Sequence, residues 1–372
     1  MGILGWAIIG ILGMLAGISL FNVLSAPSLE NKYELTETPM ISVLIPARNE
    51  EETIQRCVES LLRQTYPDFE VLILDDYSTD GTGQVLEELS GRDSRIKVFT
   101  GKPLPDGWTG KNWACHQLSR KAGGDILVFT DADNWYHAEA LRNTIRRMDQ
   151  HDLDTLSAFP QQITGTLTEK LVVPYVDVLL YSLLPLWATY LLPFPSMAAA
   201  NGQWLAFRKE VYSLIGGHQA VRGEPVEDTV LARRVKQKGA RLLTAAGTGY
   251  IFGRMYRSFG EVWEGFTKNL YGLAGYRAPV FFAVLLMLFL IGVGPVLMVF
   301  IPGWAVVGGI GMVLNGFIRF VLAIRFRHPV WISVFLHPVS VVLTLAIGLN
   351  SFLAFRRGRV RWKGRTLWVG GR

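Results

Sequence analysis

The longest charge-free run is the feature that most constrains the fold of this chain. Forty-one residues without a charge separate Arg277 from Arg319, and Pro302-Gly303 interrupts them near the middle. One membrane span needs about 20 apolar residues. The run therefore predicts two spans, over 278–301 and 304–324, joined by a tight turn. Buried helices of soluble proteins rarely contain so long an apolar run.

A second apolar run opens the chain. No charge precedes Glu30, and residues 2–25 are apolar with several glycines. The run lacks the Lys or Arg that begins a cleaved signal peptide, so we interpret 1–25 as an uncleaved transmembrane anchor. A further apolar stretch, 329–355, is interrupted by His337-Pro338. This stretch could form either a full membrane span or a re-entrant hairpin.

The net charge of +6 arises at the C-terminal end. Residues 352–372 hold seven Lys or Arg and no acid, which leaves 30 basic and 31 acidic side chains elsewhere. A basic tail after apolar spans is typical of contact with a membrane surface rather than with nucleic acid. We therefore expect a C-terminal transmembrane region over 278–355 and a basic tail over 356–372. The predicted location is the cell (inner) membrane, multi-pass, with the domain between the spans in the cytoplasm.

Residues 26–277 predict an α/β domain, because short β-branched runs alternate with helical segments. The expected strands are Ile41–Pro46, Glu70–Asp75, Ile96–Phe99, Asp125–Asp131 and Thr155–Phe159. The expected helices lie near 50–65, 81–91, 111–122 and 136–149. This alternation indicates a mostly parallel, Rossmann-like sheet with flanking helices. An apolar, proline-interrupted segment near 171–197 and an aromatic-rich segment near 257–276 suit the membrane interface, although a plain surface helix would also explain the second.

Acidic side chains follow three of the expected strands. Glu50 lies just after the first strand, Asp75 and Asp76 end the second, and Asp131 and Asp133 end the fourth. Ligands of such sheets bind beyond the carboxyl ends of the strands, so these residues predict a binding site. Residues two apart in extended chain share a face. Asp131 and Asp133 would thus suit Mg2+ or Mn2+, although turn formation alone could also explain them.

Two helix starts carry further candidates. Lys111 opens a helix after a Gly- and Pro-rich loop, where backbone N–H groups and the lysine could hold a diphosphate. Asp228 lies in the first turn of EDTVLARRVKQKG. Favourable interaction with the helix dipole would explain an acid there. The functional interpretation is a general base, with His218 as the second candidate for that role.

Four motifs in a fixed order resemble the inverting glycosyltransferases of family 2. They are VLIPARNEEETI, ILDDYSTDGT, the DAD at 131–133 and EDTVLARRVKQKG, and the resemblance covers about residues 40–270. The segments PLPDGWTGKNWACHQL and NGQWLAFRKEVYSLIGGH, with WKGR at 362–365, look like a narrower group. That group is the membrane-anchored enzymes associated with hopanoid and carotenoid biosynthesis. The resemblance implies a GT-A fold and a nucleotide-sugar donor.

The resemblance also implies roles for matching residues. Glu50, Asp75 and Asp76 would hold the base and ribose of the donor. The DAD aspartates would contact the donor and its metal, and Asp228 would be the base. Processive synthases carry a Gln/Arg-x-x-Arg-Trp motif after the base, and the closest match here, Arg254 to Ser258, lacks the Trp. Its two arginines, Arg254 and Arg257, are candidates for binding the diphosphate.

The expected function is transfer of one sugar from a UDP-sugar to a lipid of isoprenoid, carotenoid or hopanoid type. One alternative is a processive polysaccharide synthase, which the missing Trp and the few spans disfavour. Another is a transporter or membrane scaffold that only binds nucleotide. Transport pathways usually carry ionisable residues inside their spans. The spans predicted here have only Arg319 and His337.

Overall fold

The computed structural model describes residues 2–35, 37–362 and 365–366, with side chains up to residue 360. The chain divides into two compact units. The first, which we call the sheet unit, comprises Pro27–Ile163 and Leu186–Met255. The second, the helical unit, comprises Met1–Ala26, Thr164–Pro185 and Tyr256–Leu367.

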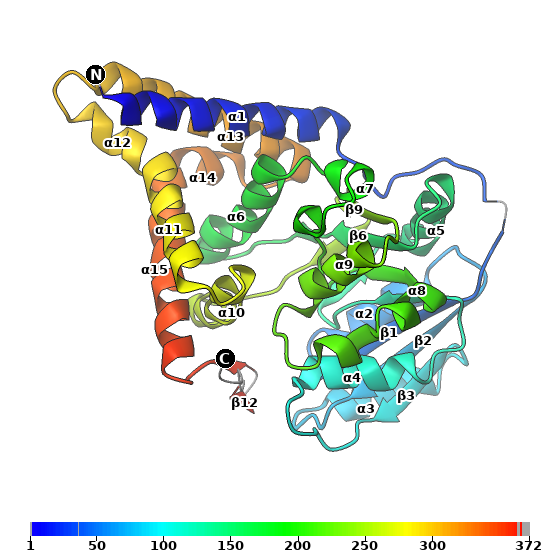
Figure 1. The fold of residues 1–372 in the computed structure, drawn as a ribbon. Coiled ribbons are helices and arrows are strands. Elements are labelled where there is room, and N and C mark those ends of the chain that lie inside the picture. The colour runs from blue at the N-terminus through cyan, green and yellow to red at the C-terminus, as the bar shows by residue number, and fades with distance from the viewer. Residues whose placement is uncertain (1, 36, 363–364, 367–372) are drawn as a thin grey trace. The chain divides into compact units, whose positions relative to one another are not determined.

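A seven-stranded sheet forms the centre of the sheet unit (Figure 1). Its strands are β1 Ile41–Ala47, β2 Phe69–Asp75, β3 Ile96–Thr100, β4 Ile126–Phe129, β6 Thr155–Phe159, β8 Leu205–Arg208 and β9 Leu242–Ala246. They follow the order β3-β2-β1-β4-β8-β6-β9. The first four are parallel, and β8 runs antiparallel to both of its neighbours. The predicted mostly parallel sheet is confirmed.

Helices cover both faces of this sheet because successive residues of a strand point to opposite faces. The helices and short 3-10 helices of the unit are α2 Ile54–Leu62, α3 Thr82–Ser90, α4 Gly110–Ser119, α5 Ala140–Gln150, α7 Ala188–Leu191, η1 Pro195–Met197, α8 Lys209–Leu214, η2 Gly217–Val221 and α9 Glu227–Gln237. Val43 and Ile45 of β1 pack in one core cluster with α2, α3 and α5. Leu44 between them packs in another, with α4, α8 and α9.

A small second sheet extends the unit beyond the end of β4. It consists of β5 Asn134–Tyr136, β7 Gln161–Gln162 and β10 Ile251–Gly253, in the order β5-β10-β7. The expected strand Asp125–Asp131 is shorter in the structure, because β4 ends at Phe129. The DAD sequence therefore lies in the turn between β4 and β5. Because this turn is not extended chain, the expectation that Asp131 and Asp133 share one face of a strand does not apply.

Eight helices and two short strands make up the described part of the helical unit. They are α1 Ile3–Ser25, α6 Leu167–Leu183, α10 Phe259–Leu273, α11 Ala278–Gly292, α12 Gly294–Val299, α13 Ala305–Phe326, α14 Val330–Phe335, α15 His337–Arg356, β11 Arg361–Trp362 and β12 Arg365–Thr366. Three of the described helices, α1, α13 and α15, are long and apolar enough to cross a membrane. The bent pair of α10 and α11 could supply a fourth crossing.

The expected span 278–301 is not one helix. It divides into α11 and α12 at Val293, just before Gly294-Pro295. Proline cannot donate a helical hydrogen bond and restricts the residue before it, which explains the break. The predicted turn at Pro302-Gly303 is present, with Gly303 at a φ of +80°. Beyond it, α13 matches the second expected span.

The stretch 329–355 also contains a break, at Leu336, between α14 and the longer α15. Because α15 has 20 residues, it is long enough for a full span. Within the helical unit, a buried contact joins α6 to the segment after α13. His328 Nε2 lies 2.9 Å from Asp177 Oδ2. Of WKGR, residues 363 and 364 lie outside the described residues, whereas Trp362 and Arg365 are paired in β11 and β12.

Candidate active site

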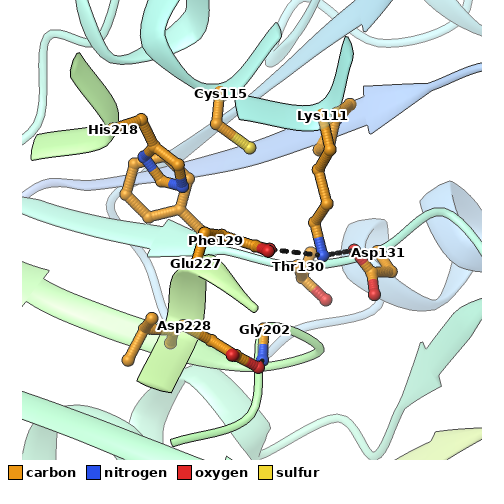
Figure 2. A pocket seen from close by; sticks show the side chains of 11 residues that line it. Lys111, Cys115, Phe129, Thr130, Asp131, Gly202, His218, Glu227 and Asp228 are labelled. Carbon is orange, nitrogen blue, oxygen red and sulfur yellow. Dashed lines mark hydrogen bonds and ion pairs between the residues drawn. The ribbon is translucent and has the colours of Figure 1, made fainter. Parts of the chain in front are cut away.

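A lysine links two carboxylates at the carboxyl end of β4. Lys111, the second residue of α4, places its Nζ 2.8 Å from Asp131 Oδ1 and 3.1 Å from Glu227 Oε1. Figure 2 shows the lysine pointing between these two side chains. Burial alone would lower the pKa of Lys111, but the two carboxylates outweigh it and raise that pKa well above its usual value. The Lys111 amine is therefore a permanent cation within an acidic pocket.

Asp228 lies on the same pocket, in the first turn of α9. Its Oδ2 accepts a hydrogen bond from the Gly202 N–H at 2.9 Å, and its Oδ1 accepts one from the Thr229 N–H at 2.6 Å. Burial and the neighbouring Glu227 raise the pKa of Asp228 to about 6, against the opposing effects of Lys111 and of the two N–H groups. The carboxylate is thus oriented, still ionised at neutral pH, and more basic than an ordinary aspartate.

Gly202 lets the backbone approach this cluster closely. A Cβ atom there would lie 3.0 Å from Lys111 Nζ, 3.4 Å from Glu227 Oε1 and 3.6 Å from Asp228 Oδ2. Hydrogen bonds on both sides of this glycine fix the loop. The Asn201 N–H donates to Ser157 Oγ at 2.8 Å, and the indole N–H of buried Trp204 donates to Thr144 Oγ1 at 3.0 Å. The NGQW sequence therefore forms a rigid wall of the pocket.

His218 also lines the pocket, but its surroundings make it a poor base. The ring is buried, its Nδ1 lies 2.8 Å from the Tyr212 hydroxyl, and it packs against the Phe129 ring. Burial, followed by the charge of Lys111, lowers the pKa of His218 to about 3. A neutral imidazole of such low basicity favours Asp228 for proton removal.

Three predicted acidic residues lie around the buried thiol of Cys57 in α2. Burial raises the pKa of this thiol, and the charges of Asp133, Glu50 and Asp131 raise it further. The Cys57 thiol also lies 3.8 Å from the Asp131 carbonyl. Glu50 and both DAD aspartates therefore lie in the neighbourhood of this thiol, although they follow two different strands.

The predicted nucleotide-binding aspartates lie in a loop that is fastened to the loop after β1. Asp75 Oδ1 accepts from the Ser78 N–H at 2.9 Å, and Asp76 is buried. The Thr79 N–H donates to Asn49 Oδ1 at 2.8 Å, and the Glu50 N–H donates to Thr82 Oγ1 at 2.7 Å. Asp75 therefore also stabilises the turn that follows it, and the two loops form one continuous edge.

The two predicted arginines belong to different units. Arg254 directly follows β10 in the sheet unit, where Gly253 pairs with Asn134 of β5. Asp133 directly precedes β5, so Arg254 and Asp133 lie at the same end of this antiparallel pair. Arg257 lies in the helical unit, where its N–H donates to Glu261 Oε2 at 3.0 Å. Within the sheet unit, Arg254 is therefore placed beside the DAD sequence, and a role for Arg257 stays a prediction.

Among the described residues, no group of three or more His, Cys, Asp or Glu side chains is arranged to hold a metal ion. The turn after β4 still supplies two carboxylates, Asp131 and Asp133, and Asp133 Oδ1 is buried without a hydrogen bond among the described residues. Oxygen donors of this kind suit a magnesium or manganese ion. Such ions commonly take one or two protein carboxylates and complete their shell with substrate phosphates and water. The pair therefore fits a metal that arrives with a phosphorylated substrate.

Glu227 is the principal site residue that the sequence did not single out, because a carboxylate in the first turn of a helix looked like a cap. Its side chain is buried and paired with Lys111. Thr130, Cys115 and Gly202 also line the pocket. The glycine of NGQW was a possible signal, since a glycine beside a buried Trp often marks a close backbone approach.

The model of the glycosyl transferase family 2 matches residues 42–193. A 4,4'-diaponeurosporenoate glycosyltransferase of Staphylococcus haemolyticus is 27% identical over 292 residues, which are 76% of this chain and 74% of the relative. The enzyme of that name from Staphylococcus aureus (strain USA300) is 28% identical over 259 residues, which are 67% of this chain and 66% of the relative.

Among solved structures, a mannosyltransferase from Pyrobaculum calidifontis in complex with GDP-Man and Mn2+ has a similar fold. The TM-score is 0.56 at 16% identity, and the match covers 95% of this chain and 98% of the other. This likeness shows the GT-A fold, in agreement with the central sheet and its acidic edge. The family model, the relatives and the fold agree: residues 42–193 match the glycosyl transferase family 2 model, the relatives are glycosyltransferases, and the chain has the GT-A fold.

Proposed function

We propose that this protein transfers one sugar from a UDP-sugar to a lipid acceptor of isoprenoid type, with inversion at the anomeric carbon. The single observation that carries the proposal is Asp228, a half-buried carboxylate with a pKa raised to about 6, beside the Lys111 ion pairs. A base with a pKa close to the working pH is suited to taking a proton from an attacking hydroxyl.

Asp228 would orient and deprotonate the acceptor hydroxyl while that oxygen attacks from the face opposite the nucleotide. Its two backbone N–H donors fix the direction of the carboxylate. Displacement from the opposite face inverts the anomeric centre. If the acceptor is instead a carboxylic acid, it arrives already ionised, and Asp228 acts mainly in positioning.

The donor would bind along the acidic rim. Glu50, Asp75 and Asp76 would hold the base and ribose, while Lys111 and Arg254 would face the diphosphate. Asp131 and Asp133 would hold Mg2+ or Mn2+, which when bound supplies charge to stabilise a leaving diphosphate. Lys111 would also reduce the repulsion between that diphosphate and the carboxylates of Asp131 and Glu227, since its positive charge offsets one of their two negative charges.

The acceptor class is supported by the relatives and by the helical unit. The staphylococcal relatives are named for 4,4'-diaponeurosporenoate, a carotenoid acid. Helices α1, α13 and α15 are suited to a bilayer, where an apolar carotenoid or hopanoid acceptor would be dissolved. We therefore propose a membrane-bound enzyme whose sheet unit faces the cytoplasm, where nucleotide sugars are available.

The test uses membranes that contain the full-length protein, radiolabelled UDP-sugars and isoprenoid acceptors with hydroxyl or carboxyl ends. We expect UDP release together with a product that carries one sugar. The variant Asp228→Asn should lower transfer to a hydroxyl acceptor at least about a thousandfold while donor binding persists. The matched control, Asp106→Asn, removes an exposed carboxylate outside the pocket and should leave turnover unchanged.

Three results would count against the proposal. Unchanged turnover by Asp228→Asn on the hydroxyl acceptor would remove this residue from the mechanism. A ladder of products with many sugars would indicate a processive synthase, and nucleotide binding without UDP release would indicate a transporter or scaffold.

A further inference from the structure

The helical unit encloses a second cavity, of about 40 Å³, that is separate from the pocket around Asp228. Apolar side chains of α1, α6, α11 and α13 form most of its lining. Its polar side chains come from Ser182, Asn315, Arg319 and His337, together with the hydroxyl of Tyr175. All of these residues belong to the helical unit. The cavity is therefore an apolar chamber with a few polar groups among helices suited to a bilayer.

Arg319 is the dominant charge of this chamber. It is 2% exposed, and its Nε donates to the Ser333 carbonyl at 3.1 Å. Its guanidinium carbon lies 5.0 Å from the centre of the Tyr175 ring. Within the described part of the chain, Nη1 makes no hydrogen bond and no acidic side chain forms an ion pair with Arg319. The nearby acid of α6, Asp177, is paired with His328.

His337 adds a second unsatisfied group. Its ring is 7% exposed, and among the described residues neither ring nitrogen makes a hydrogen bond of ordinary geometry, the nearby backbone group being that of Gly292. The neighbouring amide of Asn315 is different, because its Nδ2 donates to the Ile291 carbonyl at 2.8 Å. The cavity thus presents one guanidinium N–H group without a partner and one imidazole whose nitrogens are not fully satisfied, on two different helices.

A buried charge without a counter-ion is strongly unfavourable in an apolar medium, and so is a buried polar group without a hydrogen bond. Ionisable residues inside membrane-spanning regions usually serve a function. Water alone could fill the space, since one molecule needs about 10–15 Å³. Water does not neutralise the guanidinium, however, so the occupant that fits this site is an anion.

We infer that this cavity binds the carboxylate headgroup of a lipid. A carboxylate has two oxygens, one for the free edge of Arg319 and one for the imidazole N–H of His337, and guanidinium–carboxylate pairs are among the strongest in proteins. A phosphate monoester carries up to two charges and three acceptor oxygens, more than these donors satisfy. The apolar lining suits the chain that follows the carboxylate.

Binding of radiolabelled palmitate to the full-length protein in nanodiscs of zwitterionic lipid tests this inference. Unlabelled palmitate should compete at least about tenfold more strongly than hexadecanol, which has the same chain without the charge. Hexadecyl phosphate should also compete more weakly than palmitate. No sugar donor is present, so the result does not depend on the transfer reaction.

Arg319→Gln should weaken palmitate binding at least about tenfold. Arg325→Gln is the matched control, because it removes the same charge from the same helix at a residue that does not line the cavity. Equal competition by hexadecanol, stronger competition by hexadecyl phosphate, or wild-type affinity of Arg319→Gln would overturn the inference. The comparison of competitors uses the unaltered protein and holds even if the Arg319 variant does not fold.

Discussion

Opposing influences set the protonation state of Asp228. Burial and the negative charge of Glu227 favour its neutral form, while Lys111 and two backbone N–H groups favour the carboxylate. The balance gives a pKa of about 6, so most molecules are ionised at pH 7. An ordinary aspartate would also be ionised there but would be a weaker base, which explains why a partly buried one suits proton removal.

The first prediction concerns pH. Because the ionised form of Asp228 accepts the proton, kcat/KM with a hydroxyl acceptor should fall about tenfold for each pH unit below 6. A carboxylic acid acceptor has no proton to lose, so its profile should stay flat until its own carboxyl group protonates, near pH 4–5. Rates measured from pH 4.5 to 8 with both acceptors check this. Identical profiles for the two acceptors would contradict the role of Asp228 as a base.

The second prediction concerns the metal. Removal of divalent ions by excess EDTA should lower transfer at least about a hundredfold, and added Mn2+ or Mg2+ should restore it. Asp133→Asn should raise the metal concentration needed for half-maximal activity, because it removes one of two carboxylate donors. The control is the same reaction with EDTA that has already been saturated with Mn2+. Full activity in excess EDTA would show that Asp131 and Asp133 serve another purpose.

At the scale of single residues, the sequence identified the acids of the rim but not their partners. Asp131 and Asp228 were visible as acidic residues at a strand end and a helix start. Their connection through Lys111 depends on β4, α4 and α9 meeting in space, which no local pattern encodes. The buried environment of His218 was equally hidden, since it comes from Tyr212 and Phe129 on other elements.

At the scale of elements, the loop before β8 forms one wall of the active site. Gly202 lies in this loop, and its N–H orients Asp228 while its missing side chain leaves room for Lys111. Its φ is not among the positive values, so alanine meets no backbone strain there. The cost of a side chain is therefore local crowding rather than a change of loop conformation.

The third prediction follows from this crowding. In Gly202→Ala, the new methyl group displaces the flexible Lys111 amine and weakens its pairs with Asp131 and Glu227. We expect kcat/KM to fall about tenfold or more while the thermal midpoint stays close to the wild-type value. Gly91→Ala is a suitable control, because its Cβ would lie no closer than 3.7 Å to another atom. Equal activity of both variants would show that the pocket tolerates the methyl group.

The elements that the sequence predicted best are those with strong local patterns. The strands β1, β2, β3 and β6 and the helices between them lie close to their expected places. The strands β5, β7, β8, β9 and β10 were not predicted, because they are two to five residues long and depend on pairing with distant partners. The break at Val293 was missed because Gly294-Pro295 lies inside an otherwise continuous apolar run.

At the scale of the whole molecule, the order of segments matters because α6 interrupts the sequence of the sheet unit. Leu171, Tyr175 and Tyr181 of α6 are buried. Within the helical unit, α6 lies beside α1, α13 and α15. A fragment of residues 27–255 would keep α6 but lose all three of these helices.

The fourth prediction is that this fragment does not form a soluble domain. Its α6 would expose an apolar surface, which promotes aggregation. We expect most of the fragment in the pellet after expression without detergent, and aggregation on size-exclusion chromatography. The same fragment with 164–185 replaced by a Gly/Ser linker should be the more soluble of the two. A monodisperse fragment that retains α6 would contradict the prediction.

The contact between Asp177 and His328 has a consequence for biosynthesis. The two residues lie 151 positions apart, so Asp177 leaves the ribosome long before its partner exists. During that interval the segment carries an unpaired acid and cannot settle among apolar neighbours that have not yet been made. Maturation must therefore wait until residue 328 has been synthesised, and premature termination anywhere before it leaves quality-control proteases a substrate.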